Sequence, residues 1–267
     1  MNKIKKLIRA IGLILKRPYL LNKLLDDESV WILQVKKQWQ LESLPELKFN
    51  ELSDLKEWTV KPFSFMEGGS LSTDLALLKI LASKFESCRY FEIGTWRGES
   101  VANVAEVASE CVTLNLPGQT MLDDGRTPGY VNQHAMFSHG LPNIVHLEGD
   151  SATFDYEALV KKFDLVFIDG DHHYKSIKRD TQNVFRHLVH ENSIVVWHDY
   201  AWQPGNVRYE TLAAILDGIP EEKSGNLFAV RNTLCAIYHP GITKGHEASV
   251  IAKKDEAFEI NLRLPLK

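Results

Sequence analysis

The sequence F-E-I-G-T-W-R-G-E-S, residues 91–100, is the part of this 267-residue chain that decides its fold. An apolar run that ends at an acidic residue and continues through a glycine-bearing turn is typical of a β-strand that leads into a helix. Gly94 and Gly98 would let the backbone approach a ligand closely, and a helix after Gly98 would present free N–H groups. The turn departs from the G-x-G-x-x-G fingerprint, because Thr95 and Trp96 follow Gly94 where a second glycine is expected. The motif therefore indicates either a ligand-binding turn or a strand-to-helix turn whose glycines serve geometry alone.

Short β-rich runs alternate with amphipathic helical segments on both sides of this motif. Seven runs have the composition of strands: residues 88–94, 111–116, 143–149, 163–169, 193–199, 227–231 and 233–238. This alternation predicts an α/β fold built on a doubly wound, mostly parallel sheet of seven strands. Residues 117–142, rich in Gly, Pro and Asp, are predicted to form an insertion between the second and third strands. Long insertions of this kind often serve as lids over ligand sites.

The first residues of the chain predict an amphipathic basic helix. Ile4, Leu7, Ile8, Ile11 and Leu15 recur at helical spacing among six Lys and Arg residues. Charge interrupts the apolar run well before the ~20 residues needed to span a bilayer, so neither a membrane span nor a secretory signal is expected. Two interpretations stay open: the helix lies on an anionic inner membrane surface, or it docks on its own domain or on a partner subunit. We expect an N-terminal helix and accessory segment over residues 1–62 and the main domain over residues 63–267.

Charge and cysteine content narrow the class of protein. The formal net charge of -4 and the sequence pI near 6.2 argue against a general nucleic-acid binder, which needs a basic field to displace counterions from phosphates. Cys88, Cys111 and Cys235 lie far apart without metal-ligand spacing, and an odd number cannot form a closed disulfide set. We therefore expect a cytoplasmic protein whose cysteines are small buried apolar residues.

Three motifs together resemble a known family. E-I-G-T-x-x-G-x-S resembles motif I of the class I methyltransferases, which bind S-adenosylmethionine (SAM) on a Rossmann-like sheet. F-I-D-G-D-H-H-Y (residues 167–174) and V-V-W-H-D-Y (residues 195–200) make the chain similar to the small-molecule and sugar O-methyltransferases that include the macrolide-sugar enzymes. The resemblance covers about Gly68 to Tyr238, and it implies that residues 63–267 are a SAM-dependent methyltransferase domain.

The resemblance also implies which residues hold SAM. The positions carried over to the cofactor site are Glu92, Gly94, Thr95, Gly98, Ser100, Asn115, Asp150, Ser151 and Asp169. Asn115 stands where the family has an acidic residue that takes both ribose hydroxyls; it can accept one hydrogen bond and donate another, but it carries no charge. Asp150 lies in a turn that resembles the adenine-binding turn, and a plain helix cap is the alternative interpretation there.

The polar ends of two further strands predict the reacting end of the site. Asp169 ends the fourth predicted strand, and His198 and Asp199 end the fifth, at the edge where open α/β sheets bind ligands. In similar metal-dependent O-methyltransferases these positions hold a divalent cation, which implies Mg²⁺ or Mn²⁺; the histidine shifts the preference toward Mn²⁺, Fe²⁺ or Zn²⁺. His172 matches a histidine that resembles the general base of the macrolide-sugar group, with metal ligation or a structural hydrogen bond as alternatives.

These expectations combine into one hypothesis: the chain transfers the methyl group of SAM to an oxygen of a sugar or another small hydroxylated metabolite. The expected partners are a small-molecule or glycan acceptor, an inner membrane surface contacted through residues 1–17, and a second copy of the chain. Two alternatives remain open. One is an NAD-dependent oxidoreductase on a similar sheet, which the missing phosphate-cradling glycine disfavours. The other is a non-catalytic, membrane-associated scaffold that retains the fold.

Overall fold

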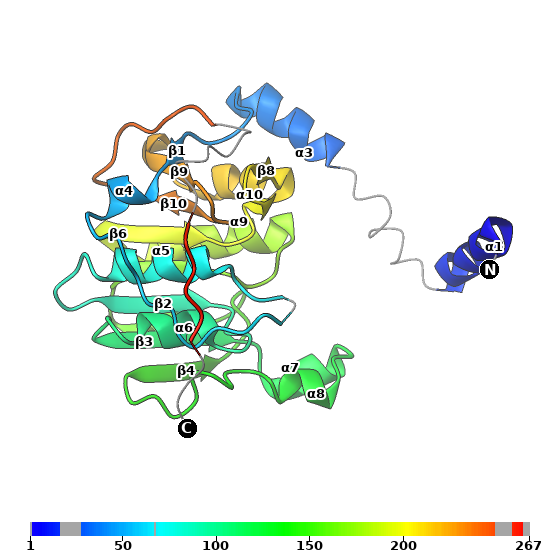
Figure 1. Cartoon of the computed structure of the whole chain (residues 1–267), viewed down its shortest axis with the longest axis horizontal. Coiled ribbons are helices and arrows are strands. Elements are labelled where there is room, and N and C mark those ends of the chain that lie inside the picture. The colour runs from blue at the N-terminus through cyan, green and yellow to red at the C-terminus, as the bar shows by residue number, and fades with distance from the viewer. Residues whose placement is uncertain (1, 17–27, 67, 249–257, 264–267) are drawn as a thin grey trace.

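A single mostly parallel sheet forms the centre of the structure (Figure 1). The computed structural model describes residues 2–16, 28–66, 68–248 and 258–263. The strands of this sheet are β1 (Glu46–Leu47), β2 (Arg89–Ile93), β3 (Glu110–Asn115), β4 (Ile144–Glu148), β5 (Phe163–Ile168), β6 (Val189–Trp197), β9 (Leu227–Val230) and β10 (Ala236–Tyr238). Their order is β1-β9-β10-β6-β5-β2-β3-β4. Strand β10 runs antiparallel to both neighbours and the other pairs are parallel. The predicted doubly wound, mostly parallel sheet is confirmed.

The strand count needs one correction. The seven predicted runs all form strands, but the sheet has eight, because β1 pairs with β9 with Glu46 beside Ala229. A strand of two residues has no periodicity that a sequence can reveal, so only the tertiary pairing defines it. Since β1 lies within residues 1–62, part of the expected accessory segment contributes to the sheet of the main domain.

Helices cover both faces of the sheet. On one face lie α4 (Phe49–Leu52), α5 (Ser72–Ala82) and α6 (Glu99–Val104); on the other lie α9 (Tyr174–Asn183) and α10 (Tyr209–Gly218), with α3 (Ser29–Gln34) packed on α10. Shorter helical segments are η2 (Val35–Trp39), η3 (Tyr156–Leu159), η4 (Val184–Leu188) and η5 (Glu221–Asn226). Successive strand residues point to opposite faces, so Tyr90 joins the apolar cluster beside α5 and Phe91 joins the cluster beside α9 and α10. The three cysteines are free and buried, as expected.

Two segments border the carboxyl ends of the parallel strands. The predicted insertion lies between β3 and β4 and contains α7 (Gly118–Asp123) and α8 (Pro128–Val131). Two backbone hydrogen bonds hold it on the glycine turn: the Ala135 N–H donates to the Trp96 carbonyl at 2.7 Å, and the Phe137 N–H to the Arg97 carbonyl at 2.9 Å. The second segment is a hairpin of β7 (Ala201–Gln203) and β8 (Asn206–Val207), directly after β6. Both segments therefore frame the edge where a ligand is expected.

Helix α1 (Lys3–Lys16) forms the predicted amphipathic helix and lies to one side of the domain (Figure 1). None of its residues is buried. Among the described residues, the structure has no helix of the length and apolarity that crossing a membrane requires.

Candidate active site

The sheet changes direction between β2 and β5. From β2 the chain moves outward through β3 to β4, then returns to the other side of β2 for β5 and continues outward through β6. In open α/β sheets, a ligand crevice lies outside the carboxyl ends of the strands at such a switch point. The residues that follow β2 and β5 are the glycine turn and Asp169, so the topology places both at this crevice.

Gly94 is required by the close approach of two chain segments. Its φ is +91°, in the left-handed region, and a Cβ added there would lie 2.0 Å from the Asp169 carbonyl oxygen. The Gly94 N–H donates to the Leu114 carbonyl at 2.9 Å, and the Asp169 N–H donates to the Ile93 carbonyl at 2.8 Å. Any side chain at Gly94 would separate the turn from Asp169, so this glycine keeps the two parts of the site together.

Gly98 is required by the close packing of the insertion on the glycine turn. Its φ is +79°, and a Cβ there would lie 2.1 Å from the Ser138 hydroxyl oxygen, which belongs to the insertion. Trp96 in the same turn contacts Tyr130, with ring centroids 4.3 Å apart. The insertion therefore packs closely against Gly98 and fixes its own position on the glycine turn.

Glu92 and Thr95 carry buried polar atoms without partners beside the turn. Glu92 is fully buried; Oε2 accepts a hydrogen bond from the Tyr90 hydroxyl at 2.5 Å, whereas Oε1 has no partner within the described part of the chain. Burial raises the pKa of Glu92 to about 8, against the opposing effects of the Tyr90 and Ser100 hydroxyls. The Thr95 hydroxyl is also buried and unpaired among the described atoms. Because unpaired buried polar groups are costly, these atoms fit a site completed by a ligand with hydrogen-bond donors.

The remaining residues carried over to the cofactor site lie at the ends of β3 and β4. The Asn115 amide oxygen accepts a hydrogen bond from the Thr95 N–H at 3.3 Å, so this side chain faces the glycine turn. Asp150 is exposed, and its carboxylate accepts from the Ala152 N–H at 2.8 Å. The Ser151 hydroxyl faces Asp180 of α9 and helps to lower the pKa of that carboxyl, although burial dominates and raises it to about 6. Asp150 thus caps its turn, which is compatible with both interpretations of this segment.

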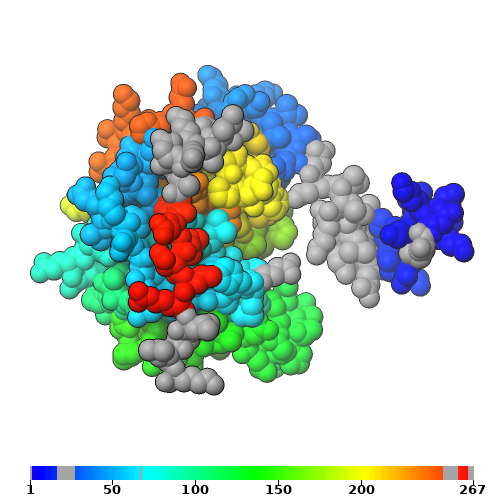
Figure 2. Space-filling model, in the orientation of Figure 1, coloured from blue at the N-terminus to red at the C-terminus, as the bar shows by residue number. Residues whose placement is uncertain are grey.

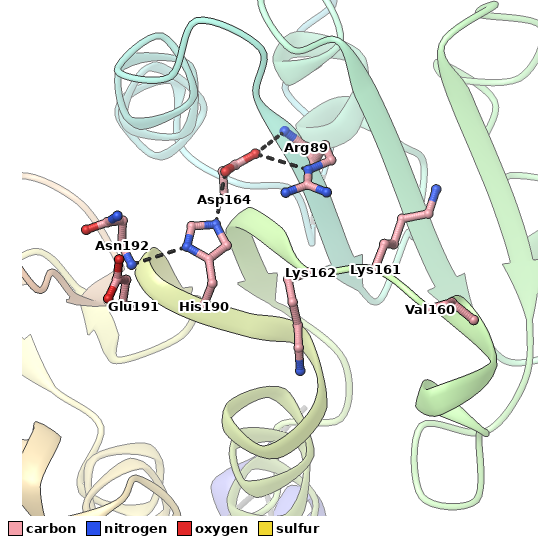
Figure 3. Close-up of a pocket in the computed structure, with 8 residues that line it drawn as sticks. All are labelled: Arg89, Val160, Lys161, Lys162, Asp164, His190, Glu191 and Asn192. Carbon is pink, nitrogen blue, oxygen red and sulfur yellow. Dashed lines mark hydrogen bonds and ion pairs between the residues drawn. The ribbon is translucent and has the colours of Figure 1, made fainter.

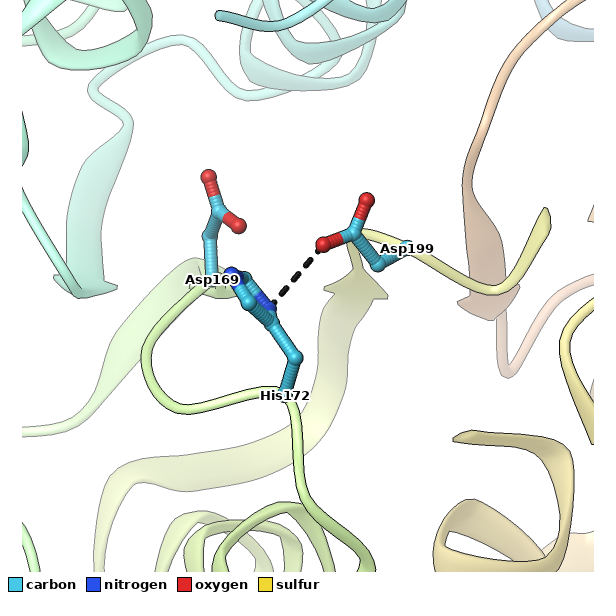
Figure 4. Close-up of side chains that lie close together, drawn as sticks. All are labelled: Asp169, His172 and Asp199. Carbon is cyan, nitrogen blue, oxygen red and sulfur yellow. Dashed lines mark ion pairs between the residues drawn. The ribbon is translucent and has the colours of Figure 1, made fainter. Parts of the chain in front are cut away.

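Asp169, His172 and Asp199 form a cluster at the carboxyl ends of β5 and β6 (Figure 4). One ligand atom from each lies within 4.8 Å of the others, and His172 Nδ1 is 3.0 Å from Asp199 Oδ2. Burial favours a lower pKa for His172, but its hydrogen bond to Asp199 and the charges of Asp169 and Asp199 outweigh burial and raise it. Burial favours a higher pKa for Asp199, but the hydrogen bonds and charges of His172 and His198 outweigh burial and lower it. The cluster therefore joins two carboxylates with an imidazole.

His198 lies behind these carboxylates and contacts both. Its Nδ1 is 3.2 Å from Asp169 Oδ1 and 3.3 Å from Asp199 Oδ1, and its Nε2 is 3.2 Å from Asp74 Oδ2. Burial tends to lower the pKa of His198, but the carboxylates around it prevail and raise it well above the usual value. The three predicted metal ligands thus lie in contact, but the group whose ligand atoms lie close enough to share one ion is Asp169, His172 and Asp199, without His198.

Two residues of this site could not be recognised in the sequence. Asp74 in α5 is fully buried; it faces His198 and accepts a hydrogen bond from the Leu234 N–H at 2.8 Å. Its only signal is a carboxylate within an otherwise apolar helix. Arg208 follows the hairpin and donates from Nη2 to the His172 carbonyl at 3.1 Å, and its Nη1 is 3.9 Å from Asp199 Oδ2. Nothing in the sequence around Arg208 signals this contact.

The donor set fits a divalent cation. Carboxylate oxygens suit Mg²⁺ and Mn²⁺, and a nearby imidazole is compatible with Mn²⁺, Fe²⁺ or Zn²⁺. The contact of His198 with Asp74 is also the arrangement in which a carboxylate orients a ligating histidine through its second nitrogen. Asp169, His172 and Asp199 are therefore able to hold such an ion.

A second concave surface lies at the opposite edge of the sheet (Figure 3). It is lined by Arg89, Val160, Lys161, Lys162, Asp164, His190, Glu191 and Asn192. These residues lie near the starts of β2, β5 and β6, away from the switch point. Asp164, which belongs to the strand-like motif F-D-L-V-F-I-D, is therefore far along its strand from Asp169, as its position near the start of the run predicts.

Comparison with known proteins agrees with this organisation. Residues 91–200 match the model of a methyltransferase domain family. That segment holds the glycine turn and the whole Asp169, His172 and Asp199 cluster. The sheet order, with β10 as its one antiparallel strand, is that of a Rossmann-like methyltransferase fold, and the family match agrees with it.

Individual relatives are more distant. The chain is 28% identical over 149 residues to uncharacterized protein R132 of Acanthamoeba polyphaga mimivirus; the match spans 52% of this chain and 66% of that protein. A solved candidate O-methyltransferase from Klebsiella pneumoniae is 15% identical with a TM-score of 0.46, covering 64% of this chain and 81% of the other. A candidate caffeoyl-CoA O-methyltransferase from Staphylococcus aureus is 20% identical with a TM-score of 0.44, covering 62% and 83%.

Proposed function

We propose that this protein is a SAM-dependent methyltransferase that methylates a hydroxyl oxygen of a sugar or another small hydroxylated metabolite, with a divalent cation at Asp169 and Asp199. One observation carries the proposal: Gly94 of the glycine turn lies against the backbone of Asp169, which also belongs to the cluster with His172 and Asp199. A donor held on the turn and an acceptor held at the cluster would share one crevice.

The residues around the turn suit the polar groups of SAM. Glu92 Oε1 and the Thr95 hydroxyl, both buried and without partners in the described structure, would receive donors of the amino-acid part. Asn115 would reach the ribose with the amide groups that its bond to Thr95 leaves free, and Asp150 would accept from adenine. When bound, SAM supplies a sulfonium methyl group that an oxygen nucleophile can attack.

His172 is placed to remove the acceptor proton. If Nδ1 donates its hydrogen to Asp199, the imidazole keeps an acceptor lone pair on Nε2. Its side chain is 47% exposed, so an acceptor hydroxyl can reach it. Asp199 then stabilises the imidazolium that forms when the proton arrives. A cation held by Asp169 and Asp199 would lower the pKa of the acceptor hydroxyl.

The space for the acceptor extends beyond Asp199. A cavity of about 340 Å³ lies among Tyr200, Tyr209, Asn232 and the β7–β8 hairpin. Tyr200 follows Asp199 directly in the chain, and the lining of the cavity combines aromatic rings with polar groups. Small polyhydroxylated molecules are commonly held by such mixed surfaces, because the rings cover the apolar face and the polar groups take the hydroxyls.

Calorimetric titration of the full chain tests the donor and metal sites separately. We expect SAM to bind with a Kd on the order of micromolar, and Glu92→Gln and Asp150→Asn each to weaken it. We expect Mn²⁺ to bind the wild type and not Asp169→Asn. The matched control is Asp171→Asn, because Asp171 lies two residues away and bonds only locally, to His173 and Ser176. Saturable binding of NADH without binding of SAM would contradict the proposal.

The same titrations decide the role of His172. If His172 is the proton acceptor, His172→Gln keeps its Mn²⁺ affinity and loses methyl transfer. A loss of Mn²⁺ binding in His172→Gln would instead make His172 a ligand and leave the base unassigned. Methyl transfer is followed by the formation of S-adenosylhomocysteine with a set of sugar and phenolic acceptors.

A further inference from the structure

Helix α1 is an amphipathic helix with no protein surface against its apolar face. Its 14 residues include five basic residues and no acidic one, and none of them is buried. The apolar residues are strongly exposed, with 65% of Ile8 and 77% of Leu15 accessible to solvent. In the space-filling view, α1 stands clear of the domain (Figure 2). Its apolar side chains therefore have no partner among the described residues.

The two kinds of side chain lie on different faces of α1. At 3.6 residues per turn, Ile4, Leu7, Ile8, Ile11 and Leu15 share one stripe, and Ile14 lies at its border. Lys6, Arg9 and Lys16 lie on the opposite side, together with the apolar Leu13, and Lys5 lies at the flank of the stripe. This is the pattern of a helix that lies flat in the interface of an anionic bilayer, with its apolar face toward the acyl chains and its basic face toward the headgroups.

The physical chemistry of an isolated helix favours an external surface. Helices of about 12–15 residues are marginal in water unless an apolar face is buried. Among the described residues, one long side-chain hydrogen bond caps its start: the Ile4 N–H donates to Asn2 Oδ1 at 3.3 Å. The five basic residues of α1, with no acidic residue among them, complement the negative headgroups of an anionic lipid surface, whereas a second copy of α1 would meet this helix with like charge.

Chain connectivity keeps α1 near the carboxyl edge of the sheet. The described chain resumes at Glu28, whose carboxylate accepts hydrogen bonds from the Tyr209 N–H at 2.9 Å and from Trp202 Nε1 at 3.3 Å. Trp202 belongs to the hairpin that follows Asp199. The twelve residue steps from Lys16 to Glu28 can span at most about 40 Å. The helix therefore stays within reach of the candidate active site.

The same edge of the sheet carries exposed apolar side chains. Phe65 is 80% exposed, Met66 lies beside it, and the Met66 carbonyl accepts from Arg97 of the glycine turn at 3.4 Å. Met136 of the insertion is 50% exposed, next to the residue that bonds to Trp96. We call these residues the apolar rim: Phe65, Met66, Leu71, Leu116, Leu122, Met136 and Trp202. They flank the turn, the ends of β3 and β6, and the start of α5.

We propose that α1 and the apolar rim together dock this protein on an anionic lipid bilayer, with the carboxyl edge of the sheet facing the membrane. The basic face of α1 supplies the attraction to acidic headgroups, and its apolar stripe supplies insertion. The rim then contacts the surface and fixes the orientation. The docking surface goes beyond the proposed function and does not depend on it, because lipid binding requires neither SAM nor a methyl acceptor.

Vesicle flotation of the full chain tests the proposal. The wild type should float with vesicles of phosphatidylcholine containing about one third phosphatidylglycerol, and not with phosphatidylcholine alone. Ile8→Glu with Ile11→Glu should abolish flotation, and Lys5→Glu with Arg9→Glu should lower the partition coefficient about tenfold or more. The matched controls are Val160→Glu and Lys84→Glu at the opposite edge, where Val160 is 90% exposed; both should float as the wild type does.

The orientation has its own test, with Phe65→Glu expected to lower the partition coefficient severalfold while Val160→Glu leaves it unchanged. The α1 variants alter no buried residue, so their thermal unfolding should match that of the wild type. Absence of flotation with the anionic vesicles at low salt would overturn the proposal. Flotation of the variant Ile8→Glu with Ile11→Glu at the wild-type level would also overturn it. A wild-type protein that binds no lipid and forms a dimer, which the same variant converts to a monomer, would overturn it as well. Equal flotation of Phe65→Glu and wild type would overturn the orientation.

Discussion

The two edges of the sheet each carry a histidine paired with an aspartate at the same distance, and only one of them has the features of an active site. At the carboxyl edge, His172 Nδ1 is 3.0 Å from Asp199; at the amino edge, His190 Nε2 is 3.0 Å from Asp164. At the amino edge both imidazole nitrogens are engaged, because His190 Nδ1 accepts from the Asn192 N–H at 3.2 Å. The Asp164 carboxylate is likewise satisfied by the Arg89 N–H at 2.7 Å.

The carboxyl edge differs in the number of carboxylates and in what they leave free. Asp169, Asp199 and Asp74 surround His198, and within the described chain the imidazole of His172 makes its ion pair through Nδ1. The His190 and Asp164 pair in Figure 3 joins β5 to β6. Because both imidazole nitrogens of His190 already have hydrogen-bond partners, this pair is not available to a reactant. The two carboxylates beside the imidazole of His172 in Figure 4, at a switch point of the sheet, provide the capacity to bind a reactant.

The largest difference between the two edges should come from removing one carboxylate charge at each. Asp169→Asn is expected to lower kcat/KM for methyl transfer by about three orders of magnitude, because the cluster loses a cation ligand that faces the acceptor. Asp164→Asn should leave kcat/KM unchanged. Steady-state kinetics at saturating SAM and Mn²⁺ provides the measurement, and equal losses in both variants would show that the edges are not distinct in function.

A smaller effect is expected when the two histidines are exchanged for glutamine. His172→Gln should lower kcat about a hundredfold with little change in KM for SAM, since a general base acts on the proton transfer and not on donor binding. His190→Gln should keep both constants. A KM effect without a kcat effect in His172→Gln would assign this residue to acceptor binding, contrary to the proposed role.

The smallest expected effect concerns the unfolding free energy of the protein, which should depend on pH through the buried carboxyl group of Glu92 beside the crevice. Glu92 has a folded-state pKa of about 8, above its ordinary value of 4.5, so its neutral form is favoured in the folded protein. The stability that this gives is fully present below about pH 4.5 and is lost as the pH rises through 8. Between about pH 5 and about pH 7, the wild type should lose about 2 kcal/mol of unfolding free energy relative to Glu92→Gln.

Urea unfolding at several pH values measures this difference. Asp180 contributes a similar pH dependence to both proteins and cancels in the comparison. If the two unfolding free energies keep a constant difference across this range, the Glu92 carboxyl is not held neutral in the folded state, and the unpaired Oε1 has a partner that the fold does not show.

Much of the fold follows from local patterns in the sequence. The strands β2, β3, β5 and β6 have largely apolar, buried centres, as expected of strands covered on both faces, and the segments between them have helical periods. Strand β1 was missed because two residues carry no pattern. The insertion was recognised by its length and composition, but its packing of Ser138 against Gly98 was not, because that contact joins residues forty positions apart.

The site was predictable only as far as the ends of strands. A strand that ends at Asp169 and another that ends at His198 and Asp199 must place these residues at one edge when the strands are parallel. His172 faces solvent and His198 is buried, and the sequence could not predict this difference. It depends on backbone angles beyond the strand, such as the positive φ of 53° at Asp199. Asp74 and Arg208 reach the site from α5 and from the hairpin, which no spacing in the sequence relates to Asp169.

The sequence by itself determined which segments form the main strands, that their sheet is mostly parallel, the helix at the N-terminus and the edge on which the polar residues gather. These depend on the periodicity of neighbouring residues and on the rule that parallel strands end together. The tertiary structure alone decided that Asp169 packs against Gly94 and that Ser138 packs against Gly98. It also decided that His198 lies between three carboxylates and that His172 stays accessible. Contacts of this kind depend on where distant segments meet, and no local pattern encodes that.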